Sequence, residues 1–277
     1  FSVIPIGGVF TEEKQGAVKI FGQHTWLQLA DPPIGVLLIL ACSAIAVYGV
    51  MLAGWSSGSK YPLLGSVRAS AQMVSYEAAL GLSVVAVVLM AGSLWTHDIV
   101  MSQAGDGFLG IIPRWNLIVT GVVPFVIFLI AATAELNRPP FDLVGAEQEL
   151  VGGFHTEYSS IRFALFFLAE FMNVVTMSAL IVTLFLGGPA GPVLIGPDWI
   201  WGPVWFLAKL LVFLFMFVWF RASLPRFRYD QLMDLGWKRA IPLALGWLLL
   251  IAALRVGNDQ GWDRYLVVGI SLAAFFL

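Results

Sequence analysis

Long apolar stretches separated by short polar segments dominate this sequence. Five of them approach the ~20 apolar residues that a helix needs to cross a bilayer. They are Ile34–Trp55, Ala69–Trp95, Trp115–Ala134, Phe163–Leu186 and Trp201–Phe220. The runs are continuous rather than alternating, and backbone groups in lipid must pair within their own segment. The pattern therefore predicts transmembrane helices rather than strands.

Three further stretches extend this pattern. Ile241–Leu254 is short on apolar residues alone, and we expect its helix to begin earlier, near Asp234. Phe1–Phe10 and Tyr265–Leu277 resemble the end and the beginning of two more spans. We therefore expect an all-α polytopic membrane protein with about eight helices, about six of them complete and two partial. Residues 1–277 are expected to form a single transmembrane domain, read as a fragment of a longer protein.

Lysine and arginine divide unequally when the spans are threaded alternately. One side receives Lys60, Arg68, Arg138, Arg162, Arg221, Arg226, Arg228, Lys238 and Arg239. The other side receives Lys14, Lys19, Arg114, Arg255 and Arg264, and Lys209 falls inside a span. Cytoplasmic loops carry the excess of positive charge, so the richer side is predicted to be cytoplasmic. We expect a multi-pass protein of a bacterial plasma membrane, with an organelle inner membrane as the less favoured location.

Composition narrows the possible functions. With 59% hydrophobic and only 12% charged residues, the chain cannot cover a soluble surface. The net charge of -2 does not favour nucleic acid as a partner. Its only cysteine, Cys42, excludes an intrachain disulfide and a cysteine-ligated iron–sulfur cluster built by this chain alone, and we expect it to be a small packing residue. No metal-ligand spacing and no nucleotide-binding signature is present, so this chain is not expected to bind NADH.

Four charged residues inside apolar spans are candidates for chemistry, because such charges are costly in a bilayer. They are Glu77, Glu135, Glu170 and Lys209. The three acids fall on different helices in the cytoplasmic half, which suits a proton path entering from that side. Lys209 is the candidate counter-charge. The alternative is a structural one, in which buried acids pair with basic residues between helices and Glu135 pairs with Arg138 one turn on.

Two polar loops flank the spans on the predicted cytoplasmic side. The loop Phe141–Arg162 carries the acids Asp142, Glu147, Glu149 and Glu157 among apolar residues that suggest packing against another surface. The loop Arg221–Met233 carries Arg226, Arg228 and Asp230. It is either a positive-inside anchor or a docking surface for a cytoplasmic partner, with its arginines reaching the acidic loop.

Three long motifs give the chain a family resemblance. KYPLLGSVRASAQMVSYE (Lys60–Glu77), AELNRPPFDLVGAEQELVGGFHTEYSSIRFALFFLAEF (Ala134–Phe171) and RASLPRFRYDQLMDLGWK (Arg221–Lys238) stand in order along the sequence. They resemble the H subunit, the quinone-site membrane component of the proton-pumping NADH:quinone oxidoreductase, respiratory complex I. The resemblance covers nearly the whole chain.

The resemblance implies a component at the heel of the complex that forms part of the quinone chamber without a redox centre of its own. It implies ubiquinone or menaquinone as substrate, with NADH, FMN and iron–sulfur clusters on partner subunits only. Antiporter-like membrane subunits, hydrophilic-arm iron–sulfur subunits and the lipid bilayer would be its partners.

By the same resemblance, the acids and Arg138 belong to a proton path, and the start of the helix after the acidic loop lines the quinone tunnel. The matching proton-path acids are Glu77, Glu135, Glu170, Asp142, Glu147, Glu149 and Glu157. The tunnel residues are Phe163, Phe166, Phe167 and Leu168. Lys209 matches a family lysine.

Two departures from the family pattern stand out. Gly145 occupies a position where family members often carry an acid, and most of the family's first helix precedes Phe1. The alternatives are the anchor subunit of a related membrane-bound hydrogenase or formate-hydrogen lyase, and a free-standing ion transporter. Against the transporter stands the lack of repeat symmetry along the chain.

Overall fold

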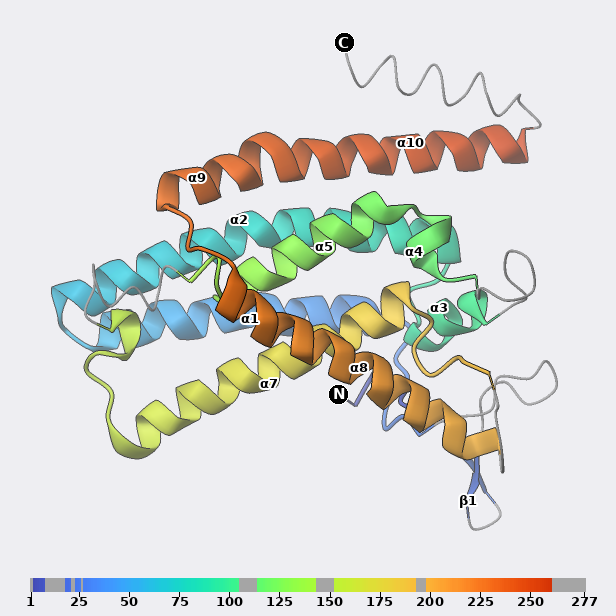
Figure 1. Ribbon diagram of the computed structural model, residues 1–277, viewed down its shortest axis with the longest axis horizontal. Helices are drawn as coiled ribbons and strands as arrows, with labels where there is room; N and C mark the ends of the chain where they lie inside the picture. Colours follow the sequence, from blue (N-terminus) through green and yellow to red (C-terminus); the bar gives the residue numbers. More distant parts are fainter. Residues whose placement is uncertain are drawn as a thin grey trace.

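The computed structural model describes residues 2–7, 18–20, 23–25, 27–104, 114–142, 152–192 and 198–260. Long helices dominate these residues and run roughly along the longest axis of the molecule, while α8 crosses them obliquely (Figure 1). A short antiparallel hairpin, β1 (Val18–Ile20) and β2 (Gln23–Thr25), pairs Val18 with Thr25. The chain is an all-α polytopic membrane protein, as its apolar pattern predicted.

Five helices of the described part are long and apolar enough to cross a membrane. These helices are α1 (Gly35–Ser56), α2 (Lys60–Ala91), α7 (Ser160–Phe185), α8 (Asp198–Ser223) and the continuous stretch of α9 (Tyr229–Asp234), η3 (Leu235–Ala240) and α10 (Ile241–Asp259). The last of these extends the short Ile241–Leu254 stretch towards its N-terminus, as expected, and η3 is a π-helical turn within it.

Shorter elements complete the described fold. They are α3 (Thr96–Gln103), α4 (Asn116–Val119), α5 (Val122–Glu135) and the 3-10 turn η2 (Gly153–His155). Residues 2–7, within the stretch expected to end a further span, form turns and irregular structure. The stretch Tyr265–Leu277 lies outside the described residues.

Two predicted spans have different bounds in the structure. Helix α2 begins at Lys60 rather than Ala69, because Pro62 lies in its first turn, where a missing backbone N–H costs nothing. The span expected over Trp115–Ala134 is divided between α4 and α5 at Gly121, which has a φ of +84°. Trp247 of α10 packs against this break and donates a hydrogen bond to the Thr120 carbonyl at 2.8 Å.

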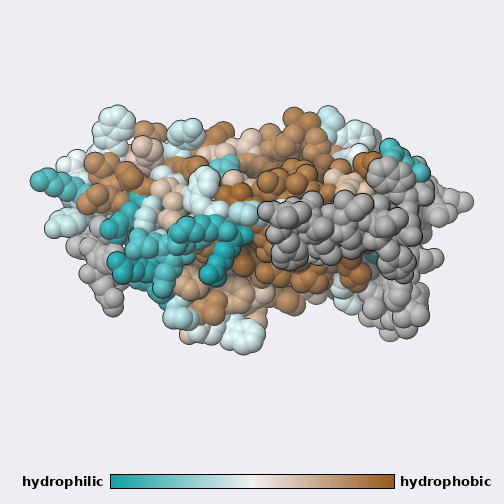
Figure 2. All heavy atoms as spheres, turned by 90° about the horizontal axis from the view of Figure 1, so that it is seen from above, coloured by the Kyte–Doolittle hydropathy of each residue, from teal (hydrophilic) through white to brown (hydrophobic). Residues whose placement is uncertain are grey.

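The main core forms where α2, α5, α7 and α8 meet. Its largest fully buried side chains include Tyr76, Phe128, Phe185 and Phe206. Apolar side chains nevertheless cover much of the outer surface of these helices, as expected for helices that face lipid. Figure 2 shows hydrophobic residues over most of one face and hydrophilic residues gathered at the end where α9 begins.

Polar segments far apart in the sequence lie at the same end of the molecule. The connection from α1 to α2, η2 and α9 lie at one end, and α3 and α4 lie at the other (Figure 1). This arrangement is the one obtained by threading the spans alternately. It places the basic loop and the described parts of the acidic loop, residues 141–142 and 152–162, on one side of the helices.

Candidate functional site

A cavity of about 810 Å³ lies between α1, α7 and the C-terminal end of α5. We call it the chamber. One face of α1 and one face of α7 form its long walls, and residues from the Glu135–Asp142 segment, η2 and the end of α8 close it. Its volume falls within the ~300–1,000 Å³ that is usual for pockets binding small organic ligands.

Glu135 is the last residue of α5 and lines the chamber although it is only 4% exposed. Ser43 of α1 donates a hydrogen bond to its carboxylate. Ser43 precedes the end of α1 by 13 residues, or roughly 20 Å of helix. Glu135 therefore lies well within the helical bundle rather than at its polar end.

Glu77 of α2 lies outside the chamber lining but interacts electrostatically with Glu135. Its side chain is partly buried, and it lies 17 residues after the start of α2. The structure thus brings two of the predicted acids close together from helices that are separate in the sequence.

Arg138 pairs with Glu170 rather than with Glu135. Its Nε lies 3.4 Å from Oε1 of Glu170, and its guanidinium lies 4.7 Å from the ring centre of Phe171. The two charged side chains are 12% and 29% exposed, and both residues line the chamber. Nη2 of Arg138 is buried without a hydrogen-bond partner among the described residues.

Gln72 fixes the turn that carries these charged groups. Its buried side-chain amide on α2 donates to the carbonyls of Ala134 at 2.7 Å and Phe141 at 2.9 Å, and to Oδ1 of Asn137 at 3.3 Å. These three acceptors span the segment from the end of α5 to the start of the acidic loop. Gln72 therefore holds Glu135 and Arg138 in a defined position relative to α2.

Aromatic side chains form the wall of the chamber nearest the polar end. Phe163, Phe166 and Phe167 line it, and their role in a quinone tunnel stays a prediction. Leu168 does not line it and is 58% exposed. The His155 imidazole packs against Phe154, Phe163 and Phe166, and burial lowers its pKa below the ordinary value. This histidine is therefore favoured in its neutral form.

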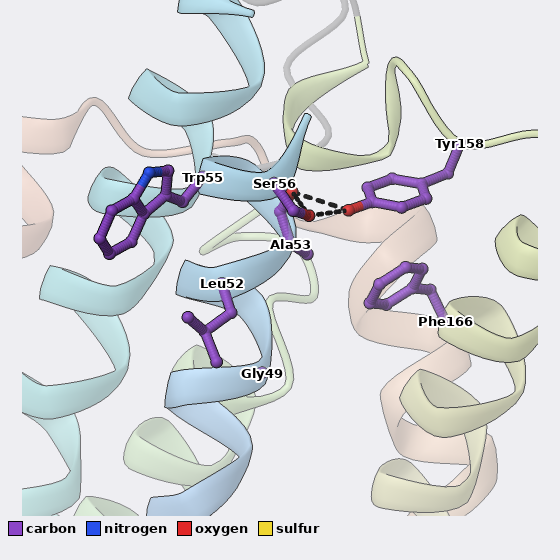
Figure 3. A pocket seen from close by; sticks show the side chains of 7 residues that line it. All are labelled: Gly49, Leu52, Ala53, Trp55, Ser56, Tyr158 and Phe166. Carbon is purple, nitrogen blue, oxygen red and sulfur yellow. Dashed lines mark hydrogen bonds between the residues drawn. The ribbon is translucent and has the colours of Figure 1, made fainter. Parts of the chain in front are cut away.

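A smaller pocket of about 470 Å³ adjoins the chamber, because Gly49 and Phe166 line both. Figure 3 shows Ser56 and Tyr158 pointing towards each other across it, with Phe166 beside Tyr158. The two hydroxyl oxygens lie 2.7 Å apart, and Tyr158 donates to the Ala53 carbonyl at 2.8 Å. This contact joins the end of α1 to the segment that precedes α7.

Lys209 does not act as a counter-charge to the acids in the described structure. Its ammonium donates to the carbonyls of Leu186, Gly188 and Ala190 at 2.7–2.9 Å, and it lies 5.5 Å from the Trp115 ring centre. These carbonyls follow the C-terminal end of α7, where backbone acceptors lack helical partners. The lysine caps this helix end.

The two polar loops meet through one ion pair. Arg226 lies 3.0 Å from Asp142, so the basic loop reaches the acidic one as predicted. Arg228 instead pairs with Asp230 of its own loop, and both side chains are largely exposed. Asp142 lines the chamber, Glu157 is exposed outside it, and Glu147, Glu149 and Gly145 lie outside the described residues.

Sequence reasoning did not identify three residues around the chamber as part of the site. Ser43 and Cys42 lie within an apolar run, and Gln72 lies within a recognised motif without a role assigned to it. Cys42 is exposed and lines the chamber, which corrects the expectation of a packing residue. The one available signal was that Ser43 is a polar residue in an otherwise apolar helical face.

Comparison with known proteins matches residues 1–252 to the family described as NADH dehydrogenase. The chain belongs to the NADH dehydrogenase family. It is 51% identical over 288 positions to the H subunit of NADH-quinone oxidoreductase from Frankia alni, covering 100% of this chain and 60% of that protein. It is 47% identical over 293 positions to the protein of the same name from Cutibacterium acnes, covering 100% of this chain and 64% of that protein. The chain thus spans less than two thirds of the length of each of these two proteins.

Proposed function

We propose that this chain acts as the H subunit of a proton-translocating NADH:quinone oxidoreductase in a bacterial plasma membrane. The single observation that carries the proposal is the chamber. One cavity of ligand size brings Glu135 and the Arg138–Glu170 pair together with the aromatic wall of α7. The family assignment and the names of the relatives support the same function.

In this proposal the quinone occupies the chamber, and the chain itself undergoes no redox change. The aromatic rings of Phe163, Phe166 and Phe167 suit an isoprenoid quinone, because they offer apolar contact area. The quinone takes up electrons from iron–sulfur clusters on partner subunits, which also hold NADH and FMN. Antiporter-like membrane subunits are the proposed partners on the membrane side.

The acids around the chamber provide a path for protons. Glu135 lines the chamber and interacts electrostatically with Glu77, and Glu170 carries the second carboxyl at the wall. A change of charge at the quinone alters the electrostatic interactions of these groups, because they lie in a poorly hydrated region where charges interact strongly. The single transmembrane domain proposed for residues 1–277 holds them in place.

The experiment is native purification from membranes through a tag on this chain, followed by NADH:quinone activity measurements. We expect flavin and iron–sulfur subunits to co-purify, with activity that a quinone-site inhibitor abolishes. Maleimide labelling of Cys42 provides a second readout, and bound inhibitor should slow it. A chain that purifies alone, or a complex that evolves hydrogen and ignores the inhibitor, would contradict the proposal.

A further inference from the structure

The α1 wall of the chamber is apolar except at one level. Its lining residues are Leu38, Ile39, Cys42, Ser43, Ala46, Gly49 and Val50. Among these, Ser43 has the only hydroxyl group. A serine at this depth needs a partner, because lipid and apolar side chains offer none.

Other serines within the helices satisfy this need locally. Ser75, Ser83 and Ser178 each donate to the carbonyl four residues earlier in their own helix. Such bonds are the usual choice for serine inside a helix. Ser43 instead donates a hydrogen bond to a residue of another helix that also lines the chamber. The acceptor is the carboxylate of Glu135, 92 residues away in the sequence.

Glu135 depends on this contact more than an exposed acid would. Within the part of the chain that the structure describes, Ser43 makes the only hydrogen bond to its carboxylate. The neighbouring arginine, Arg138, is engaged by Glu170, and the nearby Glu77 is another acid that cannot supply a positive charge to Glu135. A buried carboxylate without a donor is costly, so the hydroxyl fixes the orientation that this side chain adopts.

We propose that Ser43 is a positioning residue that holds the Glu135 carboxyl at the chamber wall in the orientation needed for proton exchange. This inference rests on the proposed function, since it assigns Ser43 a role through Glu135. The hydroxyl adds no proton-transfer step of its own. It restricts the carboxyl, which would otherwise rotate about its side-chain bonds, to one orientation at the chamber wall.

The test compares variants of the intact complex reconstituted in liposomes. Ser43→Ala removes the donor, Ser43→Thr keeps a hydroxyl, and Ser83→Ala is a control that loses a serine bonded only to its own helix. We expect Ser43→Ala to lower kcat and proton translocation roughly tenfold, the loss typical of one hydrogen bond to a charged group. KM for quinone should change less than about twofold, because Ser43 acts on the acid rather than on substrate binding.

A spectroscopic readout separates positioning from packing. The carboxyl band that disappears from the infrared difference spectrum of Glu135→Gln should shift in Ser43→Ala and return to its position in Ser43→Thr. Ser43→Cys, which is close in volume but a weak donor, provides a second variant if Ser43→Ala does not assemble. It should show the same shift and a similar loss of kcat.

The possible outcomes distinguish a failure of the role proposed for Ser43 from a failure of the proposed proton path through Glu135. The role of Ser43 alone would be overturned by two results obtained together. The Glu135→Gln complex would be inactive, while the assembled Ser43→Ala or Ser43→Cys variant would keep the wild-type kcat and an unshifted carboxyl band. Full coupled activity in Glu135→Gln would instead overturn the proposed proton path. Loss of kcat in Ser43→Ala, restored in Ser43→Thr, would support both.

Discussion

The guanidinium of Arg138 lies 3.4 Å from the carboxylate of Glu170, and the two form an ion pair at the chamber wall between the turn after α5 and helix α7. The two residues are 32 positions apart and belong to one long motif. Because the pair is only partly exposed, each charge depends on the other more than a surface pair would. The pair also links the turn after α5 to the middle of the helix that carries the aromatic wall.

Neutralising Glu170 should therefore impair both assembly and activity. In Glu170→Gln, Arg138 loses its carboxylate partner while remaining largely buried, so we expect a loss of about 1–3 kcal/mol of stability and at least about tenfold lower quinone reduction. Thermal stability and NADH:quinone activity of the purified complex provide the measurement. Asp230→Asn removes an exposed pair with Arg228 and should change stability by less than about 1 kcal/mol. Equal effects of the two substitutions would argue against a special role for the chamber pair.

Replacing Lys209 should destabilise the end of α7 without selectively abolishing proton translocation. Lys209→Met removes three hydrogen bonds to backbone carbonyls, and we expect it to lower stability by about 2–4 kcal/mol. Proton translocation per quinone reduced should remain at the wild-type ratio in the complex that assembles. A normally stable variant with a reduced ratio would instead restore the counter-charge hypothesis. Lys238→Met, which breaks an exposed pair with Asp234, is the matched control.

Replacing either of two glycines on neighbouring helices with alanine should have different effects on stability. At Gly54, a Cβ atom would lie 2.8 Å from the Pro62 carbonyl oxygen and would also meet Ser66, because α1 and α2 pack closely there. Gly54→Ala should cost about 1–3 kcal/mol. Gly81 has open space around the same atom, so Gly81→Ala should be neutral or stabilise by about 0.5–1 kcal/mol. Thermal unfolding of the purified complex measures both, and a stable Gly54→Ala variant would contradict the close packing of α1 against α2 at this position.

Ligand binding in the chamber should weaken at low pH through His155. Burial lowers the pKa of this imidazole below 6.5, so the unfolded or locally opened segment takes up a proton more readily than the packed one. The stability that the packed, neutral His155 imidazole gives to the chamber wall is fully present above pH ~6.5. It is lost as the pH falls through the lowered pKa of this imidazole. Inhibitor affinity measured between pH ~5 and ~8 should fall at the acidic end.

The matched variant for this pH effect is His155→Phe, which keeps an aromatic ring against Phe154, Phe163 and Phe166 but cannot titrate. Its inhibitor affinity should show a smaller loss at the acidic end than that of the wild type. The same pH dependence in both proteins would assign the effect to another group.

The sequence by itself determined the membrane class, the approximate spans and the family. Continuous apolar runs leave only helices as a way to satisfy the backbone in lipid, so their positions follow from composition. The three long motifs identified the family, which the comparisons confirmed. The bounds of α2 and the break at Gly121 departed from the apolar pattern, because they depend on a proline in a first turn and on a tryptophan from α10.

Only the tertiary structure decided which charges meet. Glu135 and Arg138 lie three residues apart, a spacing that suits an ion pair along a helix. Helix α5 ends at Glu135, however, and the turn that follows directs Arg138 to Glu170 of α7 instead. Lys209 likewise matches a family lysine, yet its partners are carbonyls beyond the end of α7. Side-chain partners across a bundle depend on where each helix ends and which faces come together, and hydrophobic spacing along one chain does not specify either.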